Sequence, residues 1–253
     1  MDKDRSIAYI KVKSFSETHS KKFYKDSFKK IQDSKSDFLV IDIRNNYGGS
    51  LAEIHNLYSY IAKEPYSLIK PAQITSSSSP LKTNYFRKSN SVDYLFKTIA
   101  YPGYVFSHLF SSYKGKDGNY YYKIKASKPT PPKTNAFRGK IFVLINGGSF
   151  SASSIIASKL KDDKRVTLVG EETGGANDGT VAGFYSYQVL PNSKIDLPIG
   201  LVLVQPNIQF TNTQKGVTPD IEIKETLEDR LEKKDKALTW IMDEIKKEKK
   251  ALQ

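Results

Sequence analysis

The chain has 253 residues, of which 38% are hydrophobic and 26% charged, and a formal net charge of +13 at pH 7. It is long enough to bury a sizeable core, and its composition is that of an ordinary globular protein. It contains no cysteine, which excludes disulfides, thiolate catalysis and Cys-ligated metals. The basic residues are spread along the chain, so we expect no nucleic-acid partner, and no apolar run reaches the roughly 18 residues of a membrane span.

The N-terminal part of the chain alternates strands with helices. Residues 7–12 alternate apolar and polar side chains as a strand does, and residues 14–34 carry a helical apolar pattern. Residues 38–41 are continuously apolar, as in a strand buried on both faces. A glycine turn and a helix over residues 51–62 follow. This order predicts a layered α/β fold.

The glycine turn contains Gly48 and Gly49. In α/β proteins, ligands bind at the carboxyl ends of the strands, so a backbone N–H of this turn is a candidate ligand contact. A Gly-Gly pair is equally an ordinary tight turn, and Asp42 and Arg44 can form an ion pair that braces it. The residues alone leave both interpretations open.

Residues 66–132 differ in character from the rest of the chain. They contain a run of four serines, the aromatic clusters 101–106 and 120–122, and a proline-rich end. We interpret them as an aromatic-rich insertion or lid within a core formed by residues 1–65 and 133–253. The tyrosines would pack a small satellite core or, alternatively, form a peptide-binding surface.

A second turn follows the buried apolar strand predicted over residues 141–145. Its sequence is NGGSFSASS, residues 146–154, and a helix begins after it. A serine in the first turn of a helix lies beside unpaired backbone N–H groups and the positive end of the helix dipole. That position suits a nucleophile whose attack creates an oxyanion. Serine is also a preferred helix cap, so a capping or packing role stays open.

The C-terminal part adds a third strand and turn. Residues 165–169 predict a buried strand, and a turn over 170–179 follows it. Further strands are expected at 184–190, 195–197 and 200–204.

A last helix is predicted over residues 227–247, after a short extended segment that ends at residue 223. Its apolar stripe is formed by Leu231, Leu238, Ile241 and Ile245.

Four motifs now stand in order along the chain: DxRxNxGG at 42–49, NGGSFSA at 146–152, GEETGG at 170–175 and GVTPD at 216–220. With them, most of residues 7–224 resembles the catalytic domain of the C-terminal processing peptidases, the family that includes tail-specific proteases and tricorn protease. The resemblance implies a crotonase- and ClpP-like α/β core. It also implies a serine endopeptidase that acts on peptides or unfolded proteins and uses no cofactor and no metal.

By position in these motifs, Ser151 resembles the nucleophile of the family. The resemblance places the oxyanion hole at the backbone N–H of Ala152 together with one from Gly48 or Gly49. Such donors must be fixed before the negative charge develops.

The general base departs from the family pattern. The processing-peptidase branch uses a Ser-Lys dyad whose lysine ends a GxxTxGK turn, and the matching residue here is Ala176. The tricorn-like branch takes its base from a histidine upstream of a PDZ-type domain. Because Met1 to Arg5 lead directly into a strand pattern, we expect the chain to start inside a fold. A base-bearing segment and a PDZ-type domain would then precede it.

Three histidines are present, namely His19, His55 and His108. None matches the family histidine by position, so each is expected to be solvated or packed, with His55 as the reserve candidate for the base. Glu171 and Glu172 would orient a base or carry charge at a surface turn. We therefore expect the chain alone to be weak or inactive as a peptidase, because an unactivated serine is a poor nucleophile.

Two other functions compete with the peptidase. One is a binding module on the same fold that holds a peptide or an apolar ligand, and the other is a crotonase-like acyl-CoA enzyme. Related family members are usually exported, so the resemblance suggests a periplasmic or cell-envelope location. The oligomeric state is not predicted.

Overall fold

The computed structural model describes residues 6–16, 20–209 and 215–251. The chain divides into two compact units. Unit 1 comprises Met1–Leu68, Lys128–Asp178 and Pro206–Gln253, and unit 2 comprises Ile69–Ser127 and Gly179–Gln205. The segment 179–205, which the sequence analysis placed in the core, therefore lies in unit 2.

Unit 1 is built on a five-stranded parallel sheet in the order β1-β2-β6-β7-β10. Its strands are β1 (Ile7–Lys11), β2 (Phe38–Asp42), β6 (Lys140–Ile145), β7 (Thr167–Gly170) and β10 (Ile221–Glu222). All five residues of β2 are buried, as expected for a central parallel strand covered on both faces. The predicted α/β fold is confirmed at this level.

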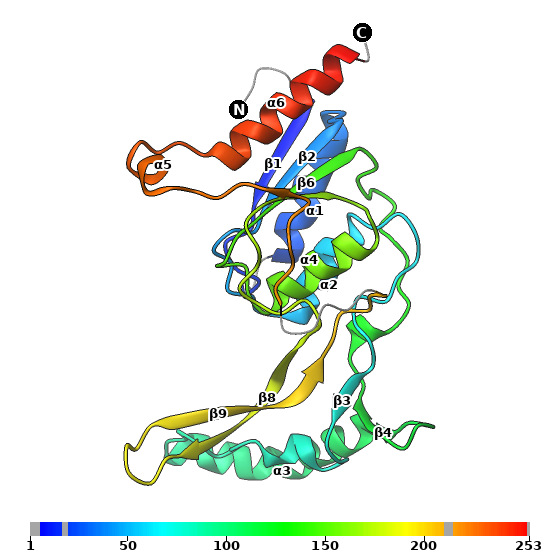
Figure 1. The fold of residues 1–253 in the computed structure, drawn as a ribbon. Coiled ribbons are helices and arrows are strands. Elements are labelled where there is room, and N and C mark those ends of the chain that lie inside the picture. Colours follow the sequence, from blue (N-terminus) through cyan, green and yellow to red (C-terminus); the bar gives the residue numbers. More distant parts are fainter. Residues whose placement is uncertain (1–5, 17–19, 210–214, 252–253) are drawn as a thin grey trace. The chain divides into compact units, whose positions relative to one another are not determined.

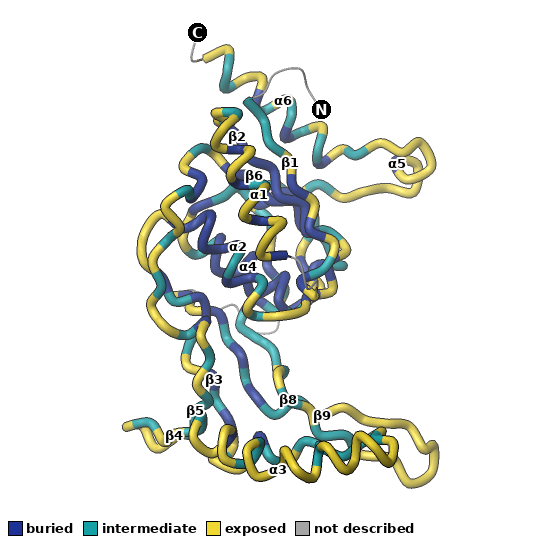
Figure 2. The backbone as a smooth tube through the Cα atoms, turned by 180° about the vertical axis from the view of Figure 1, so that it is seen from behind, coloured by how far each residue is buried: buried dark blue, intermediate teal, exposed yellow. Residues whose placement is uncertain are grey.

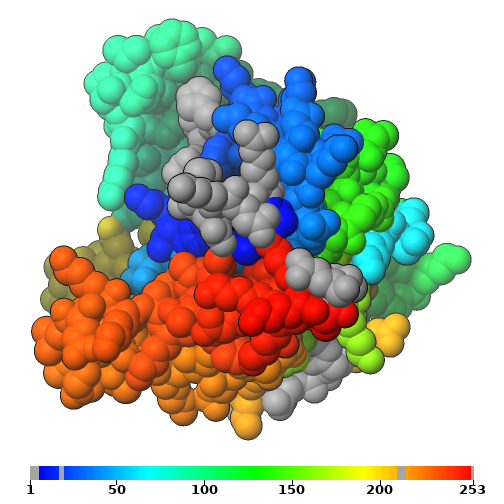
Figure 3. Space-filling view, turned by 90° about the horizontal axis from the view of Figure 1, so that it is seen from above, coloured from blue at the N-terminus to red at the C-terminus, as the bar shows by residue number. Residues whose placement is uncertain are grey.

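Helices cover both faces of this sheet (Figure 1). They are α1 (Ser20–Asp33), α2 (Leu51–Ser59), α4 (Ala152–Asp162) and α6 (Lys236–Ala251). The short helix α5 (Leu227–Leu231) also belongs to unit 1 but projects away from the sheet. Helix α6 packs Ala237, Ile241 and Ile245 on one face of the sheet. It is the red band on the surface of unit 1 (Figure 3). Helices α1, α2 and α4 lie on the opposite face, where the chain is deeply buried (Figure 2).

Two helices stand where the sequence predicted a single one. A capping box between Thr226 and Asp229 starts α5, and the left-handed residue Lys233 (φ 54°) separates it from α6. The predicted stripe is therefore wrong at Leu231, which is 74% exposed, and holds only in α6.

Unit 2 is an antiparallel sheet with one long helix. Its sheet has the order β4-β5-β3-β9-β8. The strands are β3 (Ala72–Ile74), β4 (Ser112–Lys114), β5 (Tyr120–Tyr122), β8 (Thr180–Val189) and β9 (Asp196–Val204). The helix is α3 (Ser91–Ser111), with the 3₁₀ turns η1 (Ser79–Lys82) and η2 (Lys125–Ser127) on either side of it in the sequence.

Two features of unit 2 differ from the sequence expectation. The two short strands expected at 195–197 and 200–204 are one continuous strand, β9, which pairs with β8. No helix was expected over residues 91–111, where Pro102 and Gly103 interrupt the helical pattern.

The aromatic residues of unit 2 form a satellite core around His108. Its ring contacts Tyr104 at 4.3 Å and Phe184 at 4.8 Å between centroids, and the Tyr122 hydroxyl lies 2.9 Å from its Nδ1. Burial lowers the pKa of His108. These tyrosines pack internally, as the packing alternative proposed.

Candidate active site

Three turns follow three neighbouring strands of the unit 1 sheet. Residues 43–50 follow β2, residues 146–151 follow β6, and residues 171–179 follow β7. Because the strands are parallel, their carboxyl ends meet at one edge of the sheet, where α/β proteins place their ligands.

Asn46 organises the first turn and ties it to the second. Its side-chain Nδ2 donates to the Val12 carbonyl at 2.9 Å, and its Oδ1 accepts the Gly48 N–H at 2.9 Å. Its carbonyl accepts the Phe150 N–H at 3.0 Å and the Ser153 hydroxyl at 2.8 Å. Asn46 is the asparagine of the DxRxNxGG motif, to which the sequence alone assigned no role, and it is fully buried.

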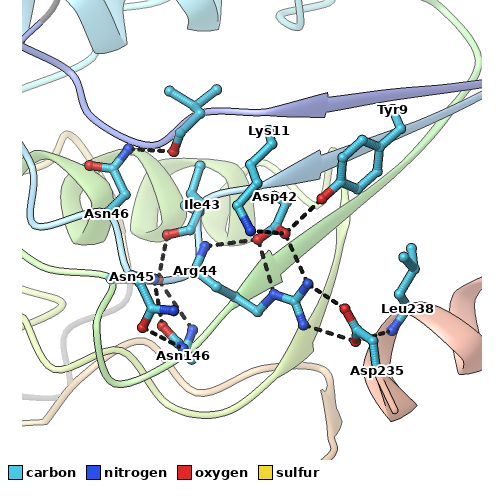
Figure 4. A network of polar contacts seen from close by, with 12 residues as sticks. Tyr9, Lys11, Asp42, Ile43, Arg44, Asn45, Asn46, Asn146, Asp235 and Leu238 are labelled. Carbon is cyan, nitrogen blue, oxygen red and sulfur yellow. Dashed lines mark hydrogen bonds and ion pairs between the residues drawn. The ribbon is translucent and has the colours of Figure 1, made fainter. Parts of the chain in front are cut away.

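A second link joins the same turns through two asparagines (Figure 4). The Asn45 N–H donates to Asn146 Oδ1 at 2.9 Å, and Asn146 Nδ2 donates to Asn45 Oδ1 at 3.1 Å. Asn146 Oδ1 also accepts the Gly148 N–H at 3.0 Å. The turns are therefore joined twice, by the buried contacts of Asn46 and by these exposed hydrogen bonds between Asn45 and Asn146.

An ion-pair network supports the base of the first turn (Figure 4). Asp42 is fully buried and accepts hydrogen bonds from Arg44 at 2.9 and 3.0 Å and from Tyr9 at 2.8 Å. Arg44 also binds Asp235, just before α6, at 2.7 and 2.9 Å. Burial acts to raise the pKa of Asp42, but the hydrogen bonds and charge of Arg44 outweigh it, and that pKa is lowered. Asp42 and Arg44 thus form the bracing ion pair, and Asp235 extends it beyond what the sequence indicated.

Ser151 occupies a sharp elbow between β6 and α4. Its backbone has φ 54° and ψ −117°, a conformation that non-glycine residues rarely adopt. Such strain costs about 1–3 kcal/mol and clusters at functional sites. A serine on a strained strand-to-helix turn is also the arrangement that exposes the nucleophile in α/β-hydrolases.

The other serines of the elbow have their hydroxyls committed to carbonyl groups. Ser149 Oγ donates to Ile43 at 2.9 Å, Ser154 Oγ to Ser149 at 3.1 Å, and Ser153 to Asn46 as described. Within the described ranges, the Ser151 hydroxyl makes no such bond, and it does not cap α4 although Ser151 is the N-cap residue. Ser151 is also only partly buried, while the other three are fully buried.

Glycines allow the turns to approach Ser151 closely. A Cβ on Gly48 would lie 2.8 Å from the Ser151 Cβ and 2.9 Å from the Ala152 nitrogen. A Cβ on Gly175, in the third turn, would lie 2.9 Å from the Ser151 nitrogen. The first and third turns therefore meet at the elbow, and no larger residue fits at either glycine without a shift.

The backbone N–H groups around the elbow differ in their partners. The Gly48 N–H is used by the Asn46 side chain. In the described part of the chain, the N–H groups of Gly49 and Ala152 donate to no protein group. Ala152 is the first residue of α4, so its N–H also lies at the positive end of the helix dipole.

Among the described residues, no lysine or histidine forms a hydrogen bond with the Ser151 hydroxyl. The His55 ring packs against Tyr66 at 5.5 Å between centroids, and His108 lies in the aromatic core of unit 2. His19 lies outside the described residues. Ala176, in the position of the family lysine, pairs with Gly216 in a β-bridge.

Glu171 and Glu172 accept hydrogen bonds from the backbone. Glu171 accepts the Glu225 N–H at 3.0 Å, and Glu172 accepts the Gly216 N–H at 2.7 Å. Both therefore hold the C-terminal segment against the third turn.

A cavity of about 420 Å³ lies at the other end of α4. Its lining includes Tyr58, Tyr66, Lys159 and Asp163, and burial raises the pKa of Asp163 to about 6. None of its lining residues comes from the three turns.

In the part of the chain that the structure describes, no helix combines the length and apolarity required to cross a bilayer.

Sequence comparison finds similarity to two curated bacterial proteases. The carboxy-terminal-processing protease of Bartonella bacilliformis is 33% identical over 93 residues, which are 36% of this chain and 19% of that protein. The tail-specific protease of Haemophilus influenzae is 24% identical over 93% of this chain and 28% of its own length. The chain thus spans less than a third of either relative.

Among solved structures, mature CPAF complexed with lactacystin is similar in fold, with a TM-score of 0.57 and 18% identity over 94% of this chain and 50% of that one. The sequence model of peptidase family S41 matches residues 6–223, which include all three turns and the GVTPD segment. The chain belongs to peptidase family S41.

Proposed function

We propose that this chain is the nucleophile-bearing part of a serine endopeptidase that cleaves peptides or unfolded proteins. The observation that carries the proposal is the contrast among the elbow serines. Ser151 has strained backbone and an uncommitted hydroxyl, whereas Ser149, Ser153 and Ser154 are buried and donate to carbonyls. A capping or packing role accounts for those three but not for Ser151.

In the proposed reaction, Ser151 Oγ attacks the carbonyl carbon of the scissile peptide bond while a base takes its proton. The tetrahedral intermediate collapses to an acyl-enzyme, and the departing amine receives the proton. Water then attacks the ester and releases the acid. The negative charge on the intermediate needs donors that are already in place.

We propose Ala152 and Gly49 as those donors. The free N–H of Ala152 and its position at the start of α4 support the first. Gly48, the alternative to Gly49, is supported less well because its N–H already binds Asn46.

The general base is proposed to be a histidine outside these residues. Ala176 stands where one branch of the family has its lysine, and His55 packs against Tyr66. A crotonase- and ClpP-like core, a lid role for the aromatic insertion and a cell-envelope location remain parts of the proposal that rest on the family resemblance.

The test is cleavage of an unfolded protein substrate by the 253-residue chain and by a protein extended upstream in its gene, each with and without Ser151→Ala. We expect cleavage by the extended protein that falls by at least about 10³-fold in its Ser151→Ala variant. Binding of a peptide without cleavage by either protein would contradict the peptidase and support a binding module on this fold.

A further inference from the structure

Helix α3 of unit 2 is apolar on two faces. One face packs on the sheet through Tyr104 and His108, as described above. The opposite face carries an exposed stripe, which we call the α3 stripe. Its members lie three, four or seven residues apart, so they share one side of the helix. They are 63–71% exposed: Val92, Phe96, Ile99, Phe106 and Phe110.

The α3 stripe is long and almost without charge. The helix has 21 residues, and its only Asp, Glu, Lys or Arg side chains are Asp93 and Lys97. Leu95, beside the stripe, is 60% exposed, and α3 is largely exposed along its length (Figure 2). Continuous exposed apolar surface of this kind marks an interaction site rather than ordinary solvent-facing surface.

The β8–β9 hairpin adds further exposed apolar side chains to unit 2. Val189 and Ile195 are exposed near its tip. The hairpin is attached to the segment that leads into α3, because Arg87 forms an ion pair with Asp196 and lies 4.1 Å from the centre of the Tyr187 ring.

Unit 2 also carries much of the positive charge of the chain. It contains ten lysines and arginines against three aspartates and no glutamate, which leaves +7 of the total of +13. Basic residues lie beyond both ends of α3, with Arg87 and Lys88 before it and Lys114 and Lys116 after it. Lys123 binds the Phe110 carbonyl at 2.9 Å and lies 4.7 Å from the centre of its ring.

We propose that the α3 stripe docks on an anionic lipid surface. The stripe would enter the boundary between headgroups and acyl chains, as interfacial helices do, and the lysines at its ends would contact anionic headgroups. Long lysine side chains can cover apolar surface while their ammonium groups stay among the headgroups. The inference rests on unit 2 alone and does not depend on peptidase activity.

The charge of unit 2 favours a lipid over other occupants. A second copy of the chain would bring another +7 against the same face, and like charges repel. An apolar peptide would cover the stripe but would leave the lysines at its ends without a partner. An anionic membrane would bury the apolar stripe and would also place anionic headgroups beside the lysines.

The test is co-sedimentation of the whole chain with vesicles of phosphatidylcholine alone or mixed with phosphatidylglycerol. We expect binding to the anionic vesicles, weakened by salt, and little binding to the neutral ones. Phe96→Ser combined with Phe106→Ser should weaken binding at least about tenfold, because two apolar insertions are lost. The matched control is Leu227→Ser with Leu231→Ser, which removes two equally exposed side chains of unit 1 and should leave binding unchanged.

A spectroscopic reporter gives a second readout. The chain has one tryptophan, Trp240, so Phe106→Trp in a Trp240→Phe background reports on the stripe alone. Its emission should shift to the blue only with anionic vesicles.

Three results would overturn the proposal. The first is that a chain with native circular dichroism does not bind anionic vesicles. The second is that the α3 and control variants lose vesicle binding equally. The third is self-association in sedimentation velocity that the α3 substitutions abolish, in a chain that does not bind vesicles.

Discussion

Gly48 shows how one residue supports the elbow. It has φ 101°, and a Cβ there would lie within 2.9 Å of Ser151 and Ala152 atoms. We predict that Gly48→Ala lowers the free energy of unfolding by roughly 1–3 kcal/mol, from backbone strain and crowding. Urea denaturation would measure this. Gly147→Ala is the matched control, because no atom lies within 4 Å of its added Cβ, and it should change stability by less than about 0.5 kcal/mol. Equal effects at both glycines would contradict the close approach.

The buried Asp42 gives a prediction about acid stability. Arg44 lowers its pKa from the ordinary 3.8 against the effect of burial. A carboxyl with a lowered folded-state pKa contributes stability at neutral pH, and this contribution is lost as the pH falls below 3.8 through the folded pKa. Arg44→Ala should lower the free energy of unfolding by about 3 kcal/mol at pH 7. It should also make the free energy of unfolding depend less on pH in the acid range.

Denaturant titrations between pH 7 and pH 2 would test the effect of Arg44→Ala. Arg230→Ala, which removes an exposed pair with Glu225, should cost less than about 1 kcal/mol. If the free energy of unfolding of Arg44→Ala changed with pH in parallel with that of the parent chain, the role of the ion pair would be refuted.

At the scale of elements, the break between α5 and α6 separates Leu231 from Ile241, which the sequence placed on one apolar stripe. Ile241 is fully buried against the sheet, whereas Leu231 is 74% exposed. Ile241→Ala should therefore lower the free energy of unfolding by roughly 2–5 kcal/mol, and Leu231→Ala should lower it by less than about 0.5 kcal/mol. Guanidinium unfolding of both variants would measure the difference. Comparable losses would mean that Leu231 packs as the single-helix prediction required.

The elements that the sequence predicted well are those with strong local signals. The buried strand β6 and the glycine turns around it follow from apolar runs and glycines alone. Helix α3 was not predicted, because Pro102 and Gly103 lie in its middle and its apolar residues fall on both faces. The role of Asn46, a motif residue, and the whole contribution of Asp235 were not predicted, because both come from contacts between segments far apart in the sequence, which local patterns do not reveal.

At the scale of the whole molecule, the chain combines a parallel sheet that gathers three turns at Ser151 with a basic unit that exposes an apolar helix. Covalent labelling tests the first of these most directly. The upstream-extended protein would be treated with a fluorophosphonate, and the modified residue would be located by peptide mass spectrometry.

We predict modification at Ser151, none in the Ser151→Ala variant, and undiminished labelling in Ser154→Ala, the matched buried serine of the same elbow. Labelling that persists in Ser151→Ala, or an extended protein that cleaves its substrate without modification of Ser151, would contradict the assignment of Ser151 as the nucleophile.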